Sequence, residues 1–131
     1  ERAQLKSWTD YYKKNRSLIH SGKIVRVDQP DDSTFVHGVV SQDKSKALFA
    51  FVQLRPAGGT LPGSLRFEGL DPLASYKVIA EQPCGPAMFM SQKSPSWLEG
   101  ATLTGQALST IGLRPPVLAP ENAILISLVK I

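Results

Sequence analysis

The sequence is poor in the residues that build disulfide-stabilised or membrane-embedded proteins. A single cysteine, Cys84, excludes an internal disulfide framework and favours a reducing compartment, so we predict a cytoplasmic protein. The apolar run Leu48–Val52 is far shorter than the roughly 20 residues that span a bilayer. The pattern of a signal peptide is also missing. We therefore predict no membrane contact.

Residues suited to catalysis or metal binding are equally sparse. The two histidines, His20 and His37, have no cysteine or second histidine at metal-ligand spacing, so we predict no metal site. The adjacent carboxylates Asp31 and Asp32 fit a turn better than a pair that flanks a glycosidic bond. Gly-x-Ser-x-Gly, phosphate-binding and dinucleotide-binding glycine motifs do not occur. The sequence thus predicts no catalytic residue and no cofactor.

The positive charge is concentrated at one end of the chain. The net charge is +4, but residues 1–26 hold seven basic and two acidic side chains, a net of +5. The remainder holds eight basic and nine acidic side chains, a net of −1. A basic stretch invites a nucleic-acid hypothesis, yet its aromatics share a face with aliphatic residues, which is typical of packing. We predict no nucleic-acid partner. A binding assay with DNA or RNA at increasing salt would separate nucleic-acid binding from a helix whose charges only face solvent.

Residues 1–20 have the apolar spacing of one helix. Its apolar face consists of Leu5, Trp8, Tyr12 and Ile19. Gly22 follows at a position where a helix end favours positive φ. The helical pattern begins at Glu1 without a capping residue, although natural helices usually carry one. We therefore expect a piece of a longer chain, with processing of a precursor as the alternative.

After Gly22 the apolar period becomes that of β-strands. Strands are expected over residues 23–28, 35–42, 46–54, 65–68, 75–81, 101–104 and 123–131. Gly105–Gly112 is expected to form a turn plus a strand, and Ala87–Met90 a short strand within a loop over 82–99. The segment 46–54 is apolar on both faces, which predicts a strand covered on both sides that lies either centrally in the sheet or under another domain. The pattern predicts a mainly β fold, an antiparallel β-sandwich preceded by one N-terminal α-helix.

Four ordered stretches carry a family resemblance. They are Tyr11–Gly22; His37–Lys44 with Ala47–Val52; Leu65–Pro72 with Tyr76–Val78; and Leu103–Gly105 through Gly112, Leu113, Pro116, Pro120 and Glu121. Their order and spacing resemble the C-terminal end of family 36 glycoside hydrolases, the α-galactosidases or melibiases. The resemblance covers nearly the whole chain and is weakest over Gln82–Ser96.

The resemblance implies a layout in which this chain is not the catalytic part. Residues 1–22 would be the last helix of a preceding (β/α)8 catalytic barrel, and residues 23–131 a C-terminal β-sandwich. The family resembles other retaining glycosidases in using two aspartates, both on the barrel. No aspartate of this sequence matches them, so we expect the parent to hydrolyse terminal α-galactosides such as melibiose and raffinose, and this chain to be inactive. Whether the parent is a homo-oligomer stays open.

Two sets of residues are candidates for contact with something else. We expect Leu5, Trp8, Tyr12 and Ile19 to pack against the barrel of the same polypeptide, which predicts exposure in this chain alone. Trp97 is a candidate for stacking on a sugar ring, with anchoring of its loop to the core as the alternative. Together with Tyr76 it supports a second hypothesis, a carbohydrate-binding module, which titration with galactosides would distinguish from a structural domain.

Overall fold

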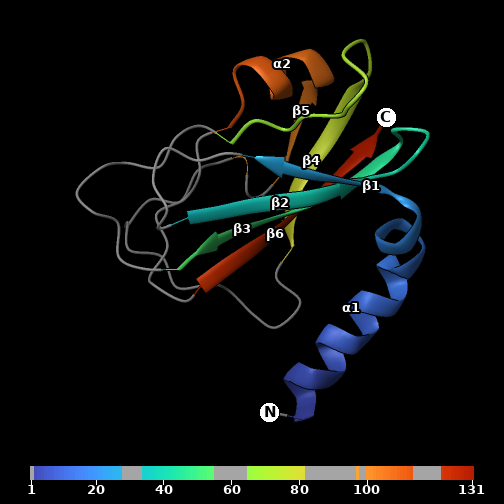
Figure 1. Ribbon diagram of the computed structural model, residues 1–131, viewed down its shortest axis with the longest axis vertical. Helices are drawn as coiled ribbons and strands as arrows, with labels where there is room; N and C mark the ends of the chain where they lie inside the picture. Colours follow the sequence, from blue (N-terminus) through green and yellow to red (C-terminus); the bar gives the residue numbers. More distant parts are fainter. Residues whose placement is uncertain (1, 28–33, 55–64, 82–96, 98–99, 114–121) are drawn as a thin grey trace.

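The structure is a computed structural model, and it describes residues 2–27, 34–54, 65–81, 97, 100–113 and 122–131. Its elements are α1 (Arg2–Ser21), β1 (Lys23–Val27), β2 (Thr34–Val40), β3 (Lys46–Gln53), β4 (Ser75–Glu81), β5 (Ala101–Thr104), α2 (Gly105–Thr110) and β6 (Asn122–Lys130). Figure 1 shows one helix running out from a sheet that carries the second, short helix at its other end. No helix of the described part is long and apolar enough to cross a membrane.

The sheet has six strands in the order β1-β2-β3-β6-β4-β5, and every pair is antiparallel. β1, β2 and β3 follow one another as hairpins, whereas β6 inserts between β3 and β4. His37 of β2 lies opposite Ala50 of β3, which lies opposite Leu125 of β6. The doubly apolar strand is therefore central, as its sequence predicts.

One face of the sheet, the inner face, holds the hydrophobic core. β3 contributes Phe49 and Phe51, and the ring of Phe49 meets that of Phe67 edge-on with centroids 4.9 Å apart. The other buried residues of the core include Val36, Val40, Leu65, Tyr76, Val78, Trp97, Leu108, Ile124, Ile126 and Leu128. Alternation along β2, β3 and β6 places these side chains on one side, because successive strand residues point to opposite faces.

A second layer covers the inner face. The segment Leu65–Leu70 buries Leu65, Phe67 and Leu70, and Leu65 forms an isolated bridge with Leu113. The expected fold class is confirmed, since the structure is a mainly antiparallel sheet preceded by one helix and is consistent with a β-sandwich. The expected strand over 65–68 is wrong in extent, because Leu65 alone of these residues forms a β-bridge, whereas the N–H of Phe67 donates to the carbonyl of Leu108 at 2.9 Å.

The turn plus strand expected over Gly105–Gly112 is also wrong, because α2 occupies Gly105–Thr110. The side chain of Thr104 caps this helix by accepting a hydrogen bond from the backbone N–H of Ala107 at 3.2 Å. Leu108 is fully buried under it. The helix ends before Gly112, which has a φ of 75°. The short strand expected at Ala87–Met90 lies outside the described residues.

The long N-terminal helix and most of the strands form as predicted. α1 ends where the N–H of Gly22 donates to the carbonyl of Leu18 at 2.9 Å. Gly22 does not adopt the expected positive φ. Glycine is needed at this position because neighbouring atoms approach the backbone closely. A Cβ would lie 2.5 Å from Cγ2 of Val39 and 2.7 Å from the Leu18 carbonyl oxygen. The crowding at this residue fixes how the helix leaves the sheet.

Candidate domain interface

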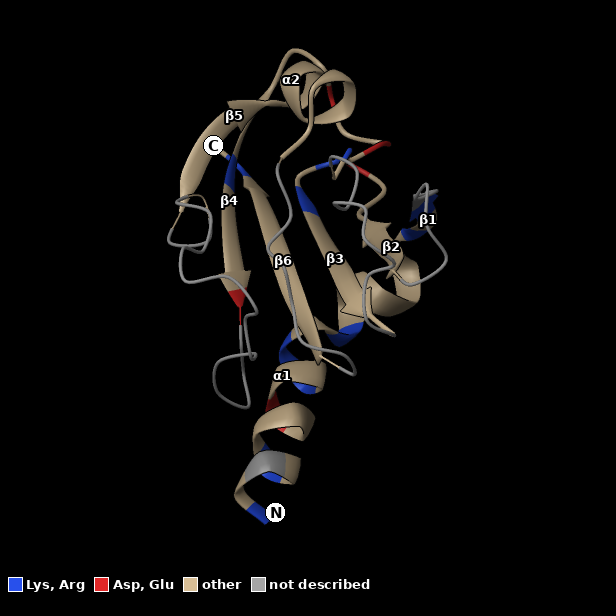
Figure 2. Ribbon diagram, turned by 90° about the vertical axis from the view of Figure 1, so that its left-hand side faces the viewer, with Lys and Arg blue, Asp and Glu red and all other residues tan. Residues whose placement is uncertain are grey.

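The exposed apolar side of α1 is the first component of the candidate site. Leu5, Trp8, Tyr12 and Ile19 are exposed by 69%, 47%, 40% and 37% of their surface, respectively. We call these four residues the helix stripe. The N-terminal half of α1 projects beyond the strands in both ribbon views, so the sheet does not cover it (Figures 1 and 2). A row of large apolar side chains left in solvent is typical of an interface.

A neighbouring side of α1 faces the sheet. Tyr11 and Leu18 are half-buried there, and the Tyr11 hydroxyl is buried without a hydrogen-bond partner in the described residues. Burial raises the pKa of Tyr11, and the carboxylate of Glu81 at the end of β4 raises it further. The Glu81 carboxylate is thus near the phenol but outside good hydrogen-bond geometry.

Basic residues border the helix stripe on its other side. The guanidinium of Arg16 lies 5.5 Å from the centre of the Tyr12 ring, a cation–π arrangement. The Tyr12 hydroxyl lies 2.6 Å from Nε2 of His20. At helical spacing, Arg2, Lys6 and Lys13 continue this border along α1. We call the five basic residues the basic row: Arg2, Lys6, Lys13, Arg16 and His20. Figure 2 shows the blue Lys and Arg positions recurring along the helix.

The outer face of the sheet, opposite the core, is the second component. Its apolar members come from four adjacent strands and include Ile24, Phe35, Val39, Leu48, Ala50, Val52 and Leu125. Several stay open to solvent, with Ile24 exposed by 75% and Phe35 by 40%. β3 therefore carries hydrophobic residues on both sides, although only its inner side lies in the core.

A pocket of about 330 Å³ lies where the two components meet. It is lined by Ile19, Ile24, His37, Gly38, Val39, Leu48, Phe49, Ala50 and Leu125. Ile19 belongs to the helix stripe and the other residues belong to the sheet. The lining contains one polar side chain, the imidazole of His37, so the pocket suits an apolar group. Ligand pockets for polar molecules need several placed hydrogen-bonding groups.

A small aromatic cluster stands beside the pocket on β1 and β2. The rings of Phe35 and His37 lie 5.0 Å apart, and the guanidinium of Arg26 lies 5.9 Å from the centre of the Phe35 ring. His37 is therefore held against an aromatic neighbour rather than grouped with other metal ligands. In the described part of the chain, no three His, Cys, Asp or Glu residues could hold a metal ion together. Cys84, Asp31 and Asp32 lie outside that part.

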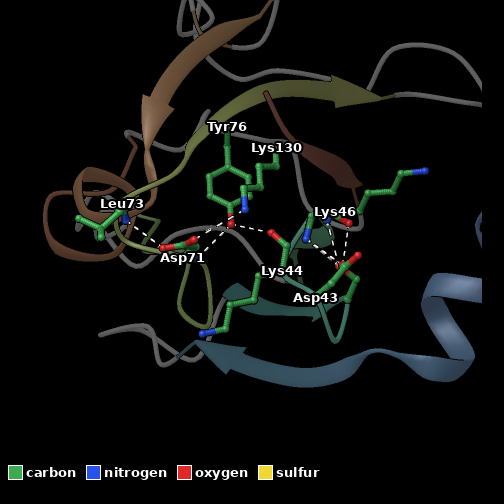
Figure 3. A network of polar contacts seen from close by, with 9 residues as sticks. Asp43, Lys44, Lys46, Asp71, Leu73, Tyr76 and Lys130 are labelled. Carbon is green, nitrogen blue, oxygen red and sulfur yellow. Dashed lines mark hydrogen bonds and ion pairs between the residues drawn. The ribbon is translucent and has the colours of Figure 1, made fainter.

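The two aromatic residues that supported sugar binding are both buried. Trp97 is 7% exposed within the core, which supports the anchoring alternative. Tyr76 is fully buried, and its hydroxyl donates to the carbonyl of Lys44 at 2.6 Å and accepts from the N–H of Asp71 at 3.0 Å (Figure 3). Neither ring presents a face on which a sugar could stack.

Sequence reasoning identified the helix stripe but missed the pocket beside it. A signal for the pocket was present in β3, because its outer residues Leu48 and Ala50 are apolar as well as its inner ones. What the sequence could not supply was the strand order, which brings Leu125 next to Ala50. Nor could it show that α1 folds back far enough for Ile19 to reach this face.

Comparison with known proteins places this arrangement in a family. The chain is 42% identical over 123 residues to an α-galactosidase of Escherichia coli, a match that covers 89% of this chain and 17% of that protein. The galactosidase domain of the α-galactosidase–sucrose kinase AgaSK superposes with a TM-score of 0.73 at 25% identity, covering 98% of this chain and 16% of that one.

A family 36 α-galactosidase of Geobacillus stearothermophilus, solved in complex with raffinose, has the same fold, with a TM-score of 0.69 at 21% identity, covering 93% of this chain and 15% of that one. The chain thus spans about a sixth of the length of these proteins. Residues 34–128 match the glycosyl hydrolase family 36 C-terminal domain, a segment that includes β2 through most of β6. This chain therefore belongs to the family of glycosyl hydrolase family 36 C-terminal domains.

Proposed function

We propose that this chain is the accessory C-terminal domain of an α-galactosidase that hydrolyses terminal α-galactosides of the melibiose and raffinose type with retention. The observation that supports this most strongly is the 42% identity to an α-galactosidase of which the chain covers only 17%. The catalytic aspartates and the galactoside site belong to a (β/α)8 barrel in the same polypeptide. The chain alone is catalytically inactive, because no barrel strand end contributes a side chain to it.

The role of the domain in that protein is structural. Residues 1–22 are the last helix of the barrel, and the helix stripe packs on the barrel so that Leu5, Trp8, Tyr12 and Ile19 become buried. Interfaces between domains of one chain bury about 600–1,500 Å². Full burial of an exposed apolar side chain stabilises by about 1.5–3 kcal/mol, and each of the four would gain the part of this that its present exposure leaves.

Carbohydrate binding by the domain itself is the weaker hypothesis. Its two supporting aromatics, Trp97 and Tyr76, lie in the core. The pocket beside α1 offers one polar side chain, His37, whereas a sugar with several hydroxyl groups needs several partners. The structural role accounts for the same pocket without requiring polar groups.

Two assays test the proposed function. The full-length polypeptide should release galactose from melibiose and raffinose, and this chain alone should neither hydrolyse nor bind them in calorimetric titration. Binding of galactose, melibiose or raffinose to the chain alone would instead support the carbohydrate-binding module. We also propose a cytoplasmic location, which cell fractionation would test.

A further inference from the structure

We propose that the outer-face pocket and the basic row together form a second docking surface, which receives an apolar side chain flanked by carboxylates from the catalytic domain of the same polypeptide. This inference rests on the proposed function. It goes beyond the packing of the helix stripe, because it assigns the outer face of β1, β2, β3 and β6 to the same contact. It also states the chemistry that the contacting surface must have.

The helix stripe and the pocket are continuous. Ile19 is the last residue of the helix stripe and also lines the pocket, so the two surfaces share a side chain. A body that covers Leu5, Trp8 and Tyr12 would therefore reach the pocket mouth as it passes Ile19. Ile24, another residue of the pocket lining, has 75% of its surface exposed and gains most from such a cover.

The lining of the pocket is almost entirely apolar. The pocket is built from Ile24, Val39, Leu48, Ala50 and Leu125 with a single imidazole, and its volume is about 330 Å³. That space accepts one large aromatic or two aliphatic side chains better than a water-soluble ligand with many polar groups. An apolar anchor that enters a pocket of this kind is the usual centre of a protein interface.

Charge favours an acidic surface over an antiparallel second copy of this chain as the occupant. The basic row runs alongside the helix stripe on α1, where Asp10 is the only acidic residue of the described helix. A second copy of this chain that packed stripe against stripe in antiparallel fashion would bring two basic rows together, which is unfavourable. A surface with carboxylates at one rim would instead pair with Lys13 and Arg16. The relatives are about six times as long as this chain, so a parent of that length has other residues in the same polypeptide, and we place the acidic rim among them.

The test is hydroxyl-radical footprinting of the full-length polypeptide, read by mass spectrometry. Ile24 and Ile111 are a matched pair, because they are the same residue type with 75% and 74% exposure, and Ile111 follows α2 at the other end of the sheet. We expect Ile24, Trp8 and Tyr12 to be oxidised several-fold more slowly than in the urea-unfolded polypeptide. We expect Ile111 to show little protection.

Two outcomes would overturn the inference. Oxidation of Ile24 as fast as that of Ile111, in a preparation that cleaves melibiose, would show an uncovered pocket while leaving the proposed function intact. Protection of Ile24 that disappears on dilution, together with a halving of the mass, would identify a second copy as the occupant. Failure to cleave any α-galactoside would count against the proposed function, independently of the footprint.

A pair of variants gives a second readout. Ile24→Glu should lower the thermal stability of the full-length polypeptide, whereas Ile111→Glu should leave it unchanged. Misfolding of this domain cannot explain such a difference, because both side chains are mostly exposed in it. Lys13→Glu should likewise loosen the domains and make cleavage between them by protease faster, while Lys44→Glu, in the exposed β2–β3 turn, should not. Equal behaviour within either pair contradicts the docking surface.

Discussion

The hydroxyl of Tyr76 and the carbonyl oxygen of Lys44 lie 2.6 Å apart, although the two residues are 32 positions apart in the sequence. This bond connects β4 to the β2–β3 turn, although β4 is not a neighbour of β2 or β3 in the sheet. The same hydroxyl accepts from the N–H of Asp71, and Lys130 lies 3.7 Å from the Asp71 carboxylate (Figure 3). One buried phenol therefore connects two turns at one end of the sheet.

Tyr76→Phe should destabilise the chain by about 1–3 kcal/mol, because it leaves the Lys44 carbonyl and the Asp71 N–H without their partner. Urea unfolding followed by circular dichroism would measure the loss. Tyr12→Phe is the control, since its hydroxyl bonds His20 on an exposed helix surface and should cost less than about 0.5 kcal/mol. Equal losses from the two substitutions would show that the Tyr76 hydroxyl does not hold the turns.

The β2–β3 turn should weaken in acid through Asp43. Hydrogen bonds from the side chains of Ser45 and Ser41 and from the Ser45 N–H lower the pKa of Asp43 from 3.8 to about 2. A carboxyl group whose folded pKa is lowered stabilises the fold above its unfolded pKa, and that stability is lost as pH falls through the folded value. The loss therefore occurs between about pH 4 and pH 2.

An NMR titration of the Asp43 carboxyl carbon would measure this directly, with a midpoint near 2. The Ser45 amide signal should move with the same midpoint, because its N–H donates to the Asp43 carboxylate at 3.0 Å. In an Asp43→Asn variant this component of the Ser45 titration should vanish. A midpoint near 3.8 would show that the serine contacts do not stabilise the charged form.

Gly105→Ala separates local helix propensity from packing. Alanine is favoured over glycine within a helix by about 1 kcal/mol, so propensity alone predicts stabilisation. Packing predicts the opposite, because a Cβ at Gly105 would lie 2.0 Å from the carbonyl oxygen of Asp71. We expect destabilisation of about 1–3 kcal/mol in thermal unfolding. Ser109→Ala in the same helix should change stability little, and a gain from Gly105→Ala would refute the close contact.

Two phenylalanines on opposite faces of the sheet should differ sharply. Phe49→Ala removes a fully buried ring that packs on Phe67 and should cost about 3–5 kcal/mol. Phe35→Ala removes a ring that is 40% exposed on the outer face, so its cost in this chain should be clearly smaller. Chemical denaturation of both variants measures the difference. Equal costs would mean that the outer face is as well packed as the core.

Local pattern was enough to place most elements. The predicted bounds of β4 and β5 are those of the structure, because alternation and flanking turns define short strands clearly. α2 was missed because glycine, serine and threonine make up half of Gly105–Thr110 and favour turns. A capping threonine at 104 followed by Leu108 was the signal that would have found it. The strand expected at 65–68 has the right alternation, but only Leu65 forms a β-bridge, with Leu113.

Sequence reasoning identified only one of the two components of the interface. Helical spacing alone identifies the stripe from Leu5 to Ile19, and its exposure agrees with that expectation, although its packing on a barrel stays a prediction. The pocket depends on pairings between distant segments, such as Ala50 with Leu125, which no local pattern encodes. The same applies to Trp97, whose burial follows from tertiary packing.

The position of β6 has a consequence for how the chain is made. This strand is the latest in the sequence, yet it lies between β3 and β4 in the middle of the sheet. During synthesis, β1-β2-β3 and β4-β5 can pair early, but each half then presents an open edge until Asn122–Lys130 emerges. Open edges recruit other strands, so a nascent chain stalled before residue 122 should aggregate. The sheet is complete only when β6 has inserted between the β1-β2-β3 half and the β4-β5 half.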